Sequence, residues 1–95
     1  MSSEVQLDEE SVPKFAPGVR LRYDEVRSAW VLLAPERLFQ PDDVALEILK
    51  LVDGERSVRA ITDSLANRFQ AARAVIAADV AAMLRNLHQR GALSL

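Results

Sequence analysis

Few residues of this 95-residue chain have the types and the spacing that catalysis requires. The chain has no cysteine, which excludes thiolate nucleophiles, thiolate metal sites and disulfides. The single histidine, His88, falls on the polar side of a predicted helix and has no partner histidine, which favours a solvated position over a metal ligand or a base. Asp42 and Asp43 form an adjacent acidic pair, but they stand where a helix should begin, and its dipole accounts for them. We therefore expect that the chain is not an enzyme and holds neither a metal nor a cofactor.

The charge of the chain is small overall and unevenly distributed. The formal net charge is -2, and four of the 14 acidic residues, Glu4, Asp8, Glu9 and Glu10, precede the first basic residue, Lys14. The remaining ten acids face all 12 bases, so the chain after Glu10 carries about +2. This balance is too mild for the basic stripe of a nucleic-acid binder, and we expect no nucleic-acid partner.

The chain is short enough for one domain. Residues 1–12 are mostly polar, acidic and aperiodic, which predicts a disordered tail, and residues 13–95 are predicted to form a single folded domain. No apolar stretch is long enough to span a membrane, and the N-terminus lacks the basic-then-apolar order of a signal peptide. We expect a cytoplasmic protein without membrane contacts.

The longest predicted helix covers residues 70–91, which contain no proline and no glycine before Gly91. Its apolar residues recur at helical spacing on one stripe. That stripe consists of Ile76, Val80, Met83, Leu84 and Leu87. Because the stripe is too apolar to face water, it must pack against the preceding seventy or so residues. Five alanines on another face indicate either high helix propensity or a surface that another chain can approach closely.

Two shorter helices are predicted before it. Pro41 suits the first position of one helix, and Asp53-Gly54 ends it. Its buried stripe is expected to contain Val44, Ala45, Ile48, Leu49 and Val52. Ser57 is a suitable N-cap for the next helix. The inner face of that helix is expected to contain Val58, Ile61, Leu65 and Phe69.

Short strands are predicted ahead of the helices. Residues 19–23 alternate apolar and polar side chains, whereas residues 30–33 are continuously apolar and are expected to be covered on both sides. Residues 37–40 could form a third, very short strand, and residues 92–95 a last one. The predicted fold is a small α+β domain resembling a winged helix-turn-helix, with a two- to three-stranded antiparallel sheet followed by three helices.

Two uses of such a domain are compatible with the sequence. In a winged-helix DNA-binding protein, the start of the last helix reads base edges and the hairpin touches phosphates. However, that helix offers mainly alanine where base-reading groups are needed, and Asp79 follows one turn later. In a peptide-recognition domain, an unpaired strand edge at residues 37–40 accepts an added strand, with the last helix as the other wall of a groove.

Several segments in order resemble the PqqD family, the D protein of pyrroloquinoline quinone (PQQ) biosynthesis. They are the sequences PGVRL at residues 17–21, WVLLAPE at 30–36, ALEIL at 45–49 followed by Asp53-Gly54, and Asp79-Val80. Each segment is weak alone, but their order in a short chain without cysteine is fairly specific. The resemblance covers roughly residues 13–95.

The resemblance implies a peptide chaperone with a winged-helix-like fold. Members of the family are the freestanding form of a recognition element for ribosomally synthesised, post-translationally modified peptides (RiPPs). The family binds the precursor peptide PqqA as an added strand and presents it to PqqE, a radical S-adenosylmethionine (SAM) enzyme that crosslinks a Glu and a Tyr of that peptide. An open sheet edge and a free N-terminal arm leave open whether the chain is a monomer or a strand-exchanged dimer.

This geometry selects eight candidate peptide-binding residues. The strand residues Arg37, Leu38, Phe39 and Gln40 are expected to offer backbone hydrogen bonds along the edge. Four side chains at the border of the helix stripe are expected to line the groove, namely Asp79, Met83, Asn86 and Arg90. Asp79 matches the aspartate that the family carries on this helix.

Overall fold

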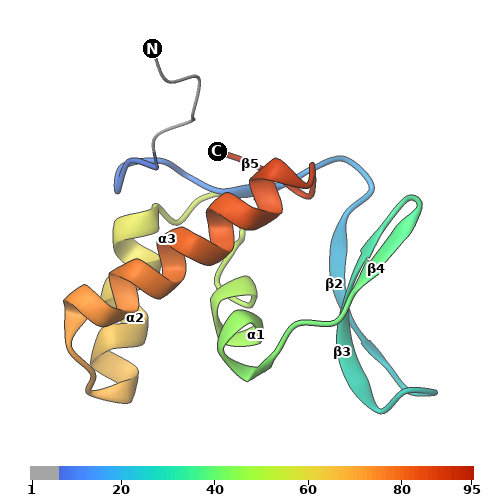
Figure 1. Cartoon of the computed structure of the whole chain (residues 1–95), viewed down its shortest axis with the longest axis horizontal. Helices are drawn as coiled ribbons and strands as arrows, with labels where there is room; N and C mark the ends of the chain where they lie inside the picture. The colour runs from blue at the N-terminus through green and yellow to red at the C-terminus, as the bar shows by residue number, and fades with distance from the viewer. Residues whose placement is uncertain (1–6) are drawn as a thin grey trace.

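A computed structural model of the chain describes residues 7–95 and has the predicted α+β organisation (Figure 1). Short strands come first and three helices follow, with one more strand at the C-terminus. The strands are β1 (Lys14–Phe15), β2 (Arg20–Asp24), β3 (Ala29–Ala34), β4 (Arg37–Phe39) and β5 (Leu93–Ser94). The helices are α1 (Asp43–Leu49), α2 (Val58–Phe69) and α3 (Arg73–Gln89). No helix within residues 7–95 is long and apolar enough to cross a membrane.

The main sheet is an antiparallel meander with strand order β2-β3-β4. Its register pairs Leu21 with Leu32 and Leu32 with Phe39, so these three side chains share the face that meets the helices. The central strand is covered on both sides, as its apolar sequence predicted: Val31 is 1% exposed and Leu32 is 0% exposed. The possible third strand is confirmed as β4, which ends at Phe39, so Gln40 lies just beyond it.

A second, two-stranded sheet joins the two ends of the described chain. β5 pairs antiparallel with β1, which confirms the predicted last strand. His88 takes part in this arrangement, because its Nδ1 donates a hydrogen bond to the carbonyl of Leu93 over 2.9 Å. The expectation of a solvated His88 is therefore wrong: the ring is half-buried and ties α3 to the strand that follows it.

The helix boundaries follow from their caps. α1 begins at Asp43, two residues after the predicted first position at Pro41, and its N-cap is Asp42, whose carboxylate accepts a hydrogen bond from the backbone N–H of Ala45. Ser57 caps α2 as predicted. α3 begins at Arg73, three residues later than predicted, because Gln70 takes a left-handed conformation with φ of 50° that ends α2.

Two apolar side chains that were assigned to buried helix stripes are exposed. Val44, in the first turn of α1, is 58% exposed, and Phe69, at the end of α2, is 51% exposed. Both lie at the ends of their helices, and helical periodicity assigns a residue to a face without showing how far along the helix the core extends. They therefore leave apolar surface in the solvent.

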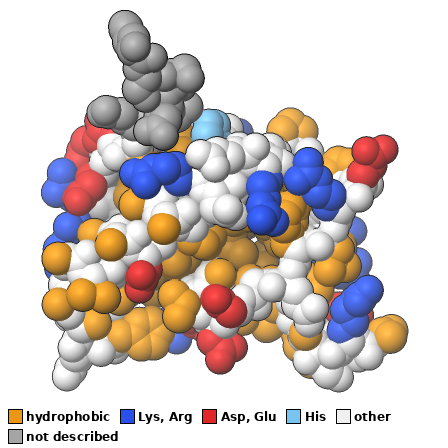
Figure 2. Space-filling model, viewed as in Figure 1, with side chains coloured by type: hydrophobic (Ala, Val, Ile, Leu, Met, Phe, Trp, Pro, Cys, Tyr) orange, Lys and Arg blue, Asp and Glu red, His pale blue; other side chains and the backbone are white. Residues whose placement is uncertain are grey.

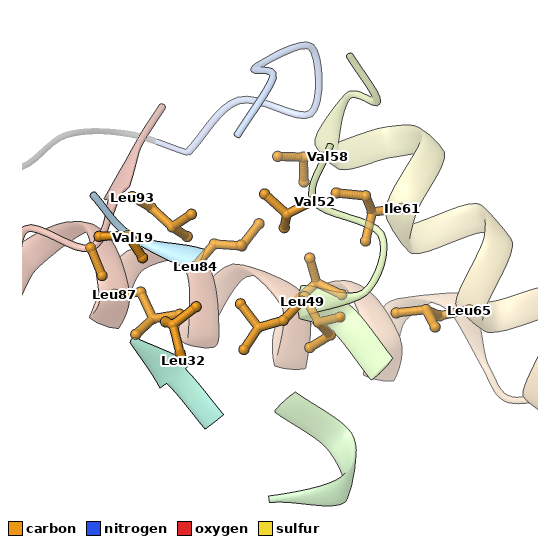
Figure 3. Packing of buried hydrophobic residues seen from close by; sticks show 13 residues of the cluster. Val19, Leu32, Leu49, Val52, Val58, Ile61, Leu65, Leu84, Leu87 and Leu93 are labelled. Carbon is orange, nitrogen blue, oxygen red and sulfur yellow. The ribbon is translucent and has the colours of Figure 1, made fainter. Parts of the chain in front are cut away.

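One hydrophobic core unites the sheet and all three helices (Figure 3). Leu84 and Leu87 of α3 lie in the same cluster as Leu32 of β3, and Leu49 of α1 lies between them and the α2 side chains. The α2 side chains Ile61 and Leu65, with Val58, close the core at its other end. The α3 stripe is confirmed as a packing surface, with Val80, Leu84 and Leu87 buried and Ile76 and Met83 half-buried at its borders.

The structure differs from the predicted disordered tail in residues 7–12, whereas residues 1–6 of that tail lie outside the described part. Leu7 packs against the core. The carbonyls of Glu9 and Ser11 accept hydrogen bonds from the N–H groups of Arg59 and Val58, which are among the unsatisfied donors at the start of α2. The Glu9 carboxylate bonds the guanidinium of Arg73 at the start of α3. Long-range partners therefore hold a segment whose local sequence has no preferred structure.

This N-terminal arm is expected to loosen at low pH. The hydrogen bonds from Arg73 lower the pKa of Glu9 below its usual value of 4.5. A carboxylate with a lowered folded-state pKa stabilises the folded form above its unfolded pKa, and this stabilisation is lost as the pH falls through the lowered value. Glu9→Gln should reduce the hydrogen-exchange protection of the Val58 and Arg59 amides at neutral pH. Wild type and variant should converge well below pH 4.5.

A matched control is Glu25→Gln, in the exposed β2–β3 turn, which should leave both amides protected. Equal protection of the two amides in wild type and Glu9→Gln at neutral pH would show that the carboxylate does not hold the arm.

Candidate functional site

β4 leaves one edge of the main sheet open. It pairs with β3 on one side, and no strand among residues 7–95 pairs with it on the other. Ala34 and Arg37 are paired across a turn of two residues, which makes them a hydrogen-bonded pair of the antiparallel ladder. In such a pair, the backbone N–H and C=O of each residue point toward the other. Because such pairs alternate along an antiparallel ladder, Phe39 also bonds to β3, and the N–H and C=O of Leu38 point to the open edge.

The four residues 37–40 were all expected to offer backbone hydrogen bonds at the edge, but the register of β4 does not leave all four of them free to do so. The backbone groups of Arg37 and Phe39 are used inside the sheet, and Gln40 lies outside the strand. Leu38 is the residue of β4 whose main-chain donor and acceptor both face outward. The sequence alone could not show which backbone groups of β4 face outward, because that depends on the length of the turn between β3 and β4.

A groove of about 380 Å³ runs between β4 and α3. Leu38, Phe39 and Gln40 line one side, and Met83, Asn86 and Arg90 line the other. The floor is formed by core residues, including Leu32, Leu49 and Leu87. The open edge of β4 and the outer flank of α3 thus border one concave surface.

The walls of the groove are held together by direct contacts. The guanidinium carbon of Arg90 lies 5.8 Å from the centre of the Phe39 ring, within cation–π range. Met83 is half-buried and packs against the outside of the core, so its side chain forms part of the groove wall. Its flexible thioether can adapt to guest side chains of different shapes.

Six of the eight predicted side chains come together in this groove, and two lie elsewhere. Arg37 lines a neighbouring hollow of about 460 Å³ near the start of β2, which shares Phe39 and Arg90 with the groove. Asp79 does not reach the groove: it is exposed about one helical turn before Met83 and lines a third hollow between the helices. Its assignment to the β4 groove is therefore wrong, because α1 crosses α3 between the two positions.

The start of α1 also lines the groove, which the sequence did not predict. Pro41, Asp42 and Ala45 line its end, where the chain leaves β4 and enters the helix. The signal was present in the short connection: Asp42 caps α1 only three residues after Phe39, so the first turn of α1 has to lie beside β4.

The charged groups with clearly shifted pKa values lie outside the groove. The Arg73 guanidinium donates hydrogen bonds to the carboxylates of Glu9 and Asp63, and these bonds raise the pKa of Arg73. The pKa of Asp53 is lowered because its Oδ1 accepts hydrogen bonds from the backbone N–H groups of Arg56 and Glu55. The Asp53 interactions shape the turn between α1 and α2. These shifts mark structural contacts and not an acid–base pair.

The arrangement at the start of α3 opposes DNA reading. Arg73, which a base-reading helix would need free, contacts Glu9 and Asp63. In the β2–β3 hairpin, Arg27 contacts Asp24. The helix then exposes Asp79, whose charge repels phosphate.

The fold and the groove together define a small mixed α+β domain with an open strand edge beside a long helix. Comparison with known proteins identifies it further: the family described as coenzyme PQQ synthesis protein D (PqqD) matches residues 29–93. The chain belongs to the PqqD family, which confirms the resemblance seen in its sequence motifs.

Similar proteins support this assignment over almost the whole chain. A protein of Rhodopseudomonas palustris strain HaA2 named PqqA binding protein is 50% identical over 93 residues, covering 98% of this chain and 91% of the relative. A bifunctional coenzyme PQQ synthesis protein C/D of Methylorubrum extorquens is 50% identical over 82 residues, covering 86% of this chain and 22% of that longer protein. The same domain therefore occurs both alone and fused to another.

Two solved structures share the fold. The solution NMR structure of the PqqD truncation of Methylobacterium extorquens PqqCD, described as a functional and stand-alone RiPP recognition element, matches with a TM-score of 0.79 and 46% identity. It covers 95% of this chain and 96% of that one. The crystal structure of PqqD from Xanthomonas campestris matches with a TM-score of 0.60 and 40% identity, covering 95% and 100% of the two chains.

Substitution of the neighbouring α3 residues Met83 and Leu84 by alanine should have very different effects on the free energy of unfolding. Leu84 is 0% exposed in the core, so Leu84→Ala should lower the free energy of unfolding by about 2–5 kcal/mol. Met83 is half-buried at the groove, so Met83→Ala should cost at most about 1 kcal/mol. Urea denaturation of the two variants measures both values. A loss for Met83→Ala as large as that for Leu84→Ala would place Met83 in the core and not in the groove wall.

Proposed function

We propose that this protein is a peptide chaperone of PQQ biosynthesis. It binds the precursor peptide PqqA by strand addition on β4 and presents it to the radical SAM enzyme PqqE in the cytoplasm, without making or breaking a bond itself. The open edge of β4 beside the α3 groove is the observation that carries this proposal. Relatives named PqqA binding protein supply the identity of the guest.

In this proposal the guest peptide pairs with the outward N–H and C=O of Leu38 and continues the β2-β3-β4 meander by one strand. Alternate guest side chains then point to opposite faces of the extended sheet. Those on the helix side enter the groove, where Met83, Asn86 and Arg90 meet them. Main-chain pairing fixes the register, and the groove selects the side chains.

The contact can be mapped by titrating ¹⁵N-labelled protein with full-length PqqA peptide. We expect chemical-shift changes at the amides of residues 37–40 and of the C-terminal half of α3. Changes confined to Arg20, Arg22 and Arg27 of the β2–β3 hairpin would overturn strand addition at β4. Peptide affinity should also depend far less on salt than DNA binding does, because main-chain pairing and apolar contacts release no condensed counterions, whereas binding of a DNA duplex would fall steeply with salt.

Proline at position 38 should weaken peptide binding without unfolding the sheet. The N–H of Leu38 does not bond to β3, so Leu38→Pro removes a donor from the open edge and leaves the ladder intact. The guest carbonyl loses its partner in the complex, and we expect an affinity loss of about tenfold or more.

Leu38→Ser is the matched control, because it removes the leucine side chain but keeps the backbone N–H. It should retain more affinity than Leu38→Pro when both are compared by isothermal titration with the same peptide. If the two variants bind equally, the main-chain donor of residue 38 does not contact the guest.

A further inference from the structure

The hollow between the helices, in which Asp79 lies, is lined mainly by apolar side chains. We call it the second hollow below. Its volume is about 380 Å³, and α1, the end of α2 and the first half of α3 surround it. Val44 and Phe69, the two side chains exposed against expectation, both line it, as does Ile76 of α3, which also packs against the core. Pockets of this size hold large apolar groups.

The end of α2 forms a fixed wall of this hollow. Arg68 bonds the carboxylate of Glu47 on α1, and its guanidinium carbon lies 4.8 Å from the centre of the Phe69 ring. These contacts hold the exposed Phe69 ring in place next to the hollow. An aromatic ring held this way in solvent is a preorganised contact surface.

The second hollow continues the groove beside β4. Asp79 and Ile76 lie about one and two helical turns before Met83, on neighbouring positions of the same flank of α3. The first turn of α1 separates the two concave regions, and the chain leaving β4 leads directly to it (Figure 1). A peptide that runs past the end of β4 therefore passes over Asp42 and Asp43 and meets the second hollow next.

The charges along this path change sign. Arg37 and Arg90 lie at the β4 end, whereas Asp43 and Asp79 lie at the rim of the second hollow. Figure 2 shows acidic side chains beside the exposed hydrophobic surface below α3 and basic ones over its C-terminal end. Within residues 7–95, neither Asp43 nor Asp79 forms an ion pair, in contrast to Glu47, which also faces this hollow.

We propose that the second hollow binds the segment of the precursor peptide that flanks the added strand. The segment inserts a large apolar or aromatic side chain between Val44, Ile76 and Phe69, and places a Lys or Arg close to Asp43 and Asp79. This inference rests on the proposed function, since it takes the guest to be the peptide on β4. It gives the domain a two-part site in which α1 separates a strand-pairing half from a side-chain pocket.

Two valines provide a matched test. Val44 and Val75 are both 58% exposed and both lie in the first turn of a helix, but only Val44 lines the hollow. Val44→Lys should weaken binding of full-length PqqA peptide by about tenfold or more, because it replaces apolar contact with a charge. Val75→Lys should leave the affinity unchanged. Thermal unfolding of both variants checks that the fold is retained.

Peptides shortened stepwise from each end locate the flank. Val44→Lys should matter only for peptides that retain the segment beyond the strand, and for shorter peptides both variants should bind as wild type does. Asp79→Asn should lose several-fold in affinity at low salt and little at high salt, because an exposed charge pair is screened.

The outcomes separate this inference from the proposed function. If the amides of residues 37–40 shift on titration but Val44→Lys binds like Val75→Lys, strand addition stands and the flank pocket is overturned. The same holds if Val44→Lys changes only the association of the chain with itself or with PqqE. If the amides of residues 37–40 do not shift, strand addition fails and the flank pocket fails with it.

Discussion

The packing of α3 against the rest of the chain is the interaction on which the structure depends. Val80, Leu84 and Leu87 are buried on one stripe and meet side chains of β3, α1 and α2 in a single core. Because a helix that buries one stripe has fixed rotation about its axis, the flank of α3 that carries Asn86 and Arg90 is fixed as well. The burial of this stripe therefore fixes the helix wall of the groove beside β4 and of the hollow between the helices.

An open strand edge is ordinarily a hazard, since it can pair with any other extended chain. Here β4 has only three residues, and alternation leaves only Leu38 with both of its main-chain groups outward. Arg37 puts a charge at one end of the edge, and Pro41 with the first turn of α1 closes the other. Such an edge is too short to template aggregation, yet it can set the register of a guest that other contacts hold in place.

The sequence predicted the elements well because each has a local signal. The Ser57 cap, the alternation of residues 19–23 and the α3 stripe lie within windows of a few turns or strands. Features that depend on distant partners were not predictable. The Glu9–Arg73 contact joins residues 64 positions apart, and nothing in the composition of the tail reports it.

The candidate site was likewise predictable only where it depends on local spacing along one helix. Helical spacing placed Met83, Asn86 and Arg90 on the correct flank of α3, and the structure brings them to β4. The same spacing also placed Asp79 there, but the path of α1 across α3 assigns it to a different hollow. Where one helix crosses another depends on how side chains from several elements pack, and a one-dimensional period does not contain that information. The exposure of Val44 and Phe69 was missed for the same reason.

Magnitudes explain why a recognition domain of this kind needs more than its strand edge. A net contribution of about 0.5–1.5 kcal/mol per hydrogen bond gives the two main-chain bonds of Leu38 roughly 1–3 kcal/mol, whereas even a millimolar complex requires about 4 kcal/mol. Binding also costs the guest its conformational freedom, which adds to the deficit. Burial of about 200 Å² of apolar guest surface contributes about 5 kcal/mol, and only concave apolar surface beside the edge can provide it. The affinity of the domain must therefore come mainly from the hollows along α3, while the edge of β4 determines which guest residue enters each of them.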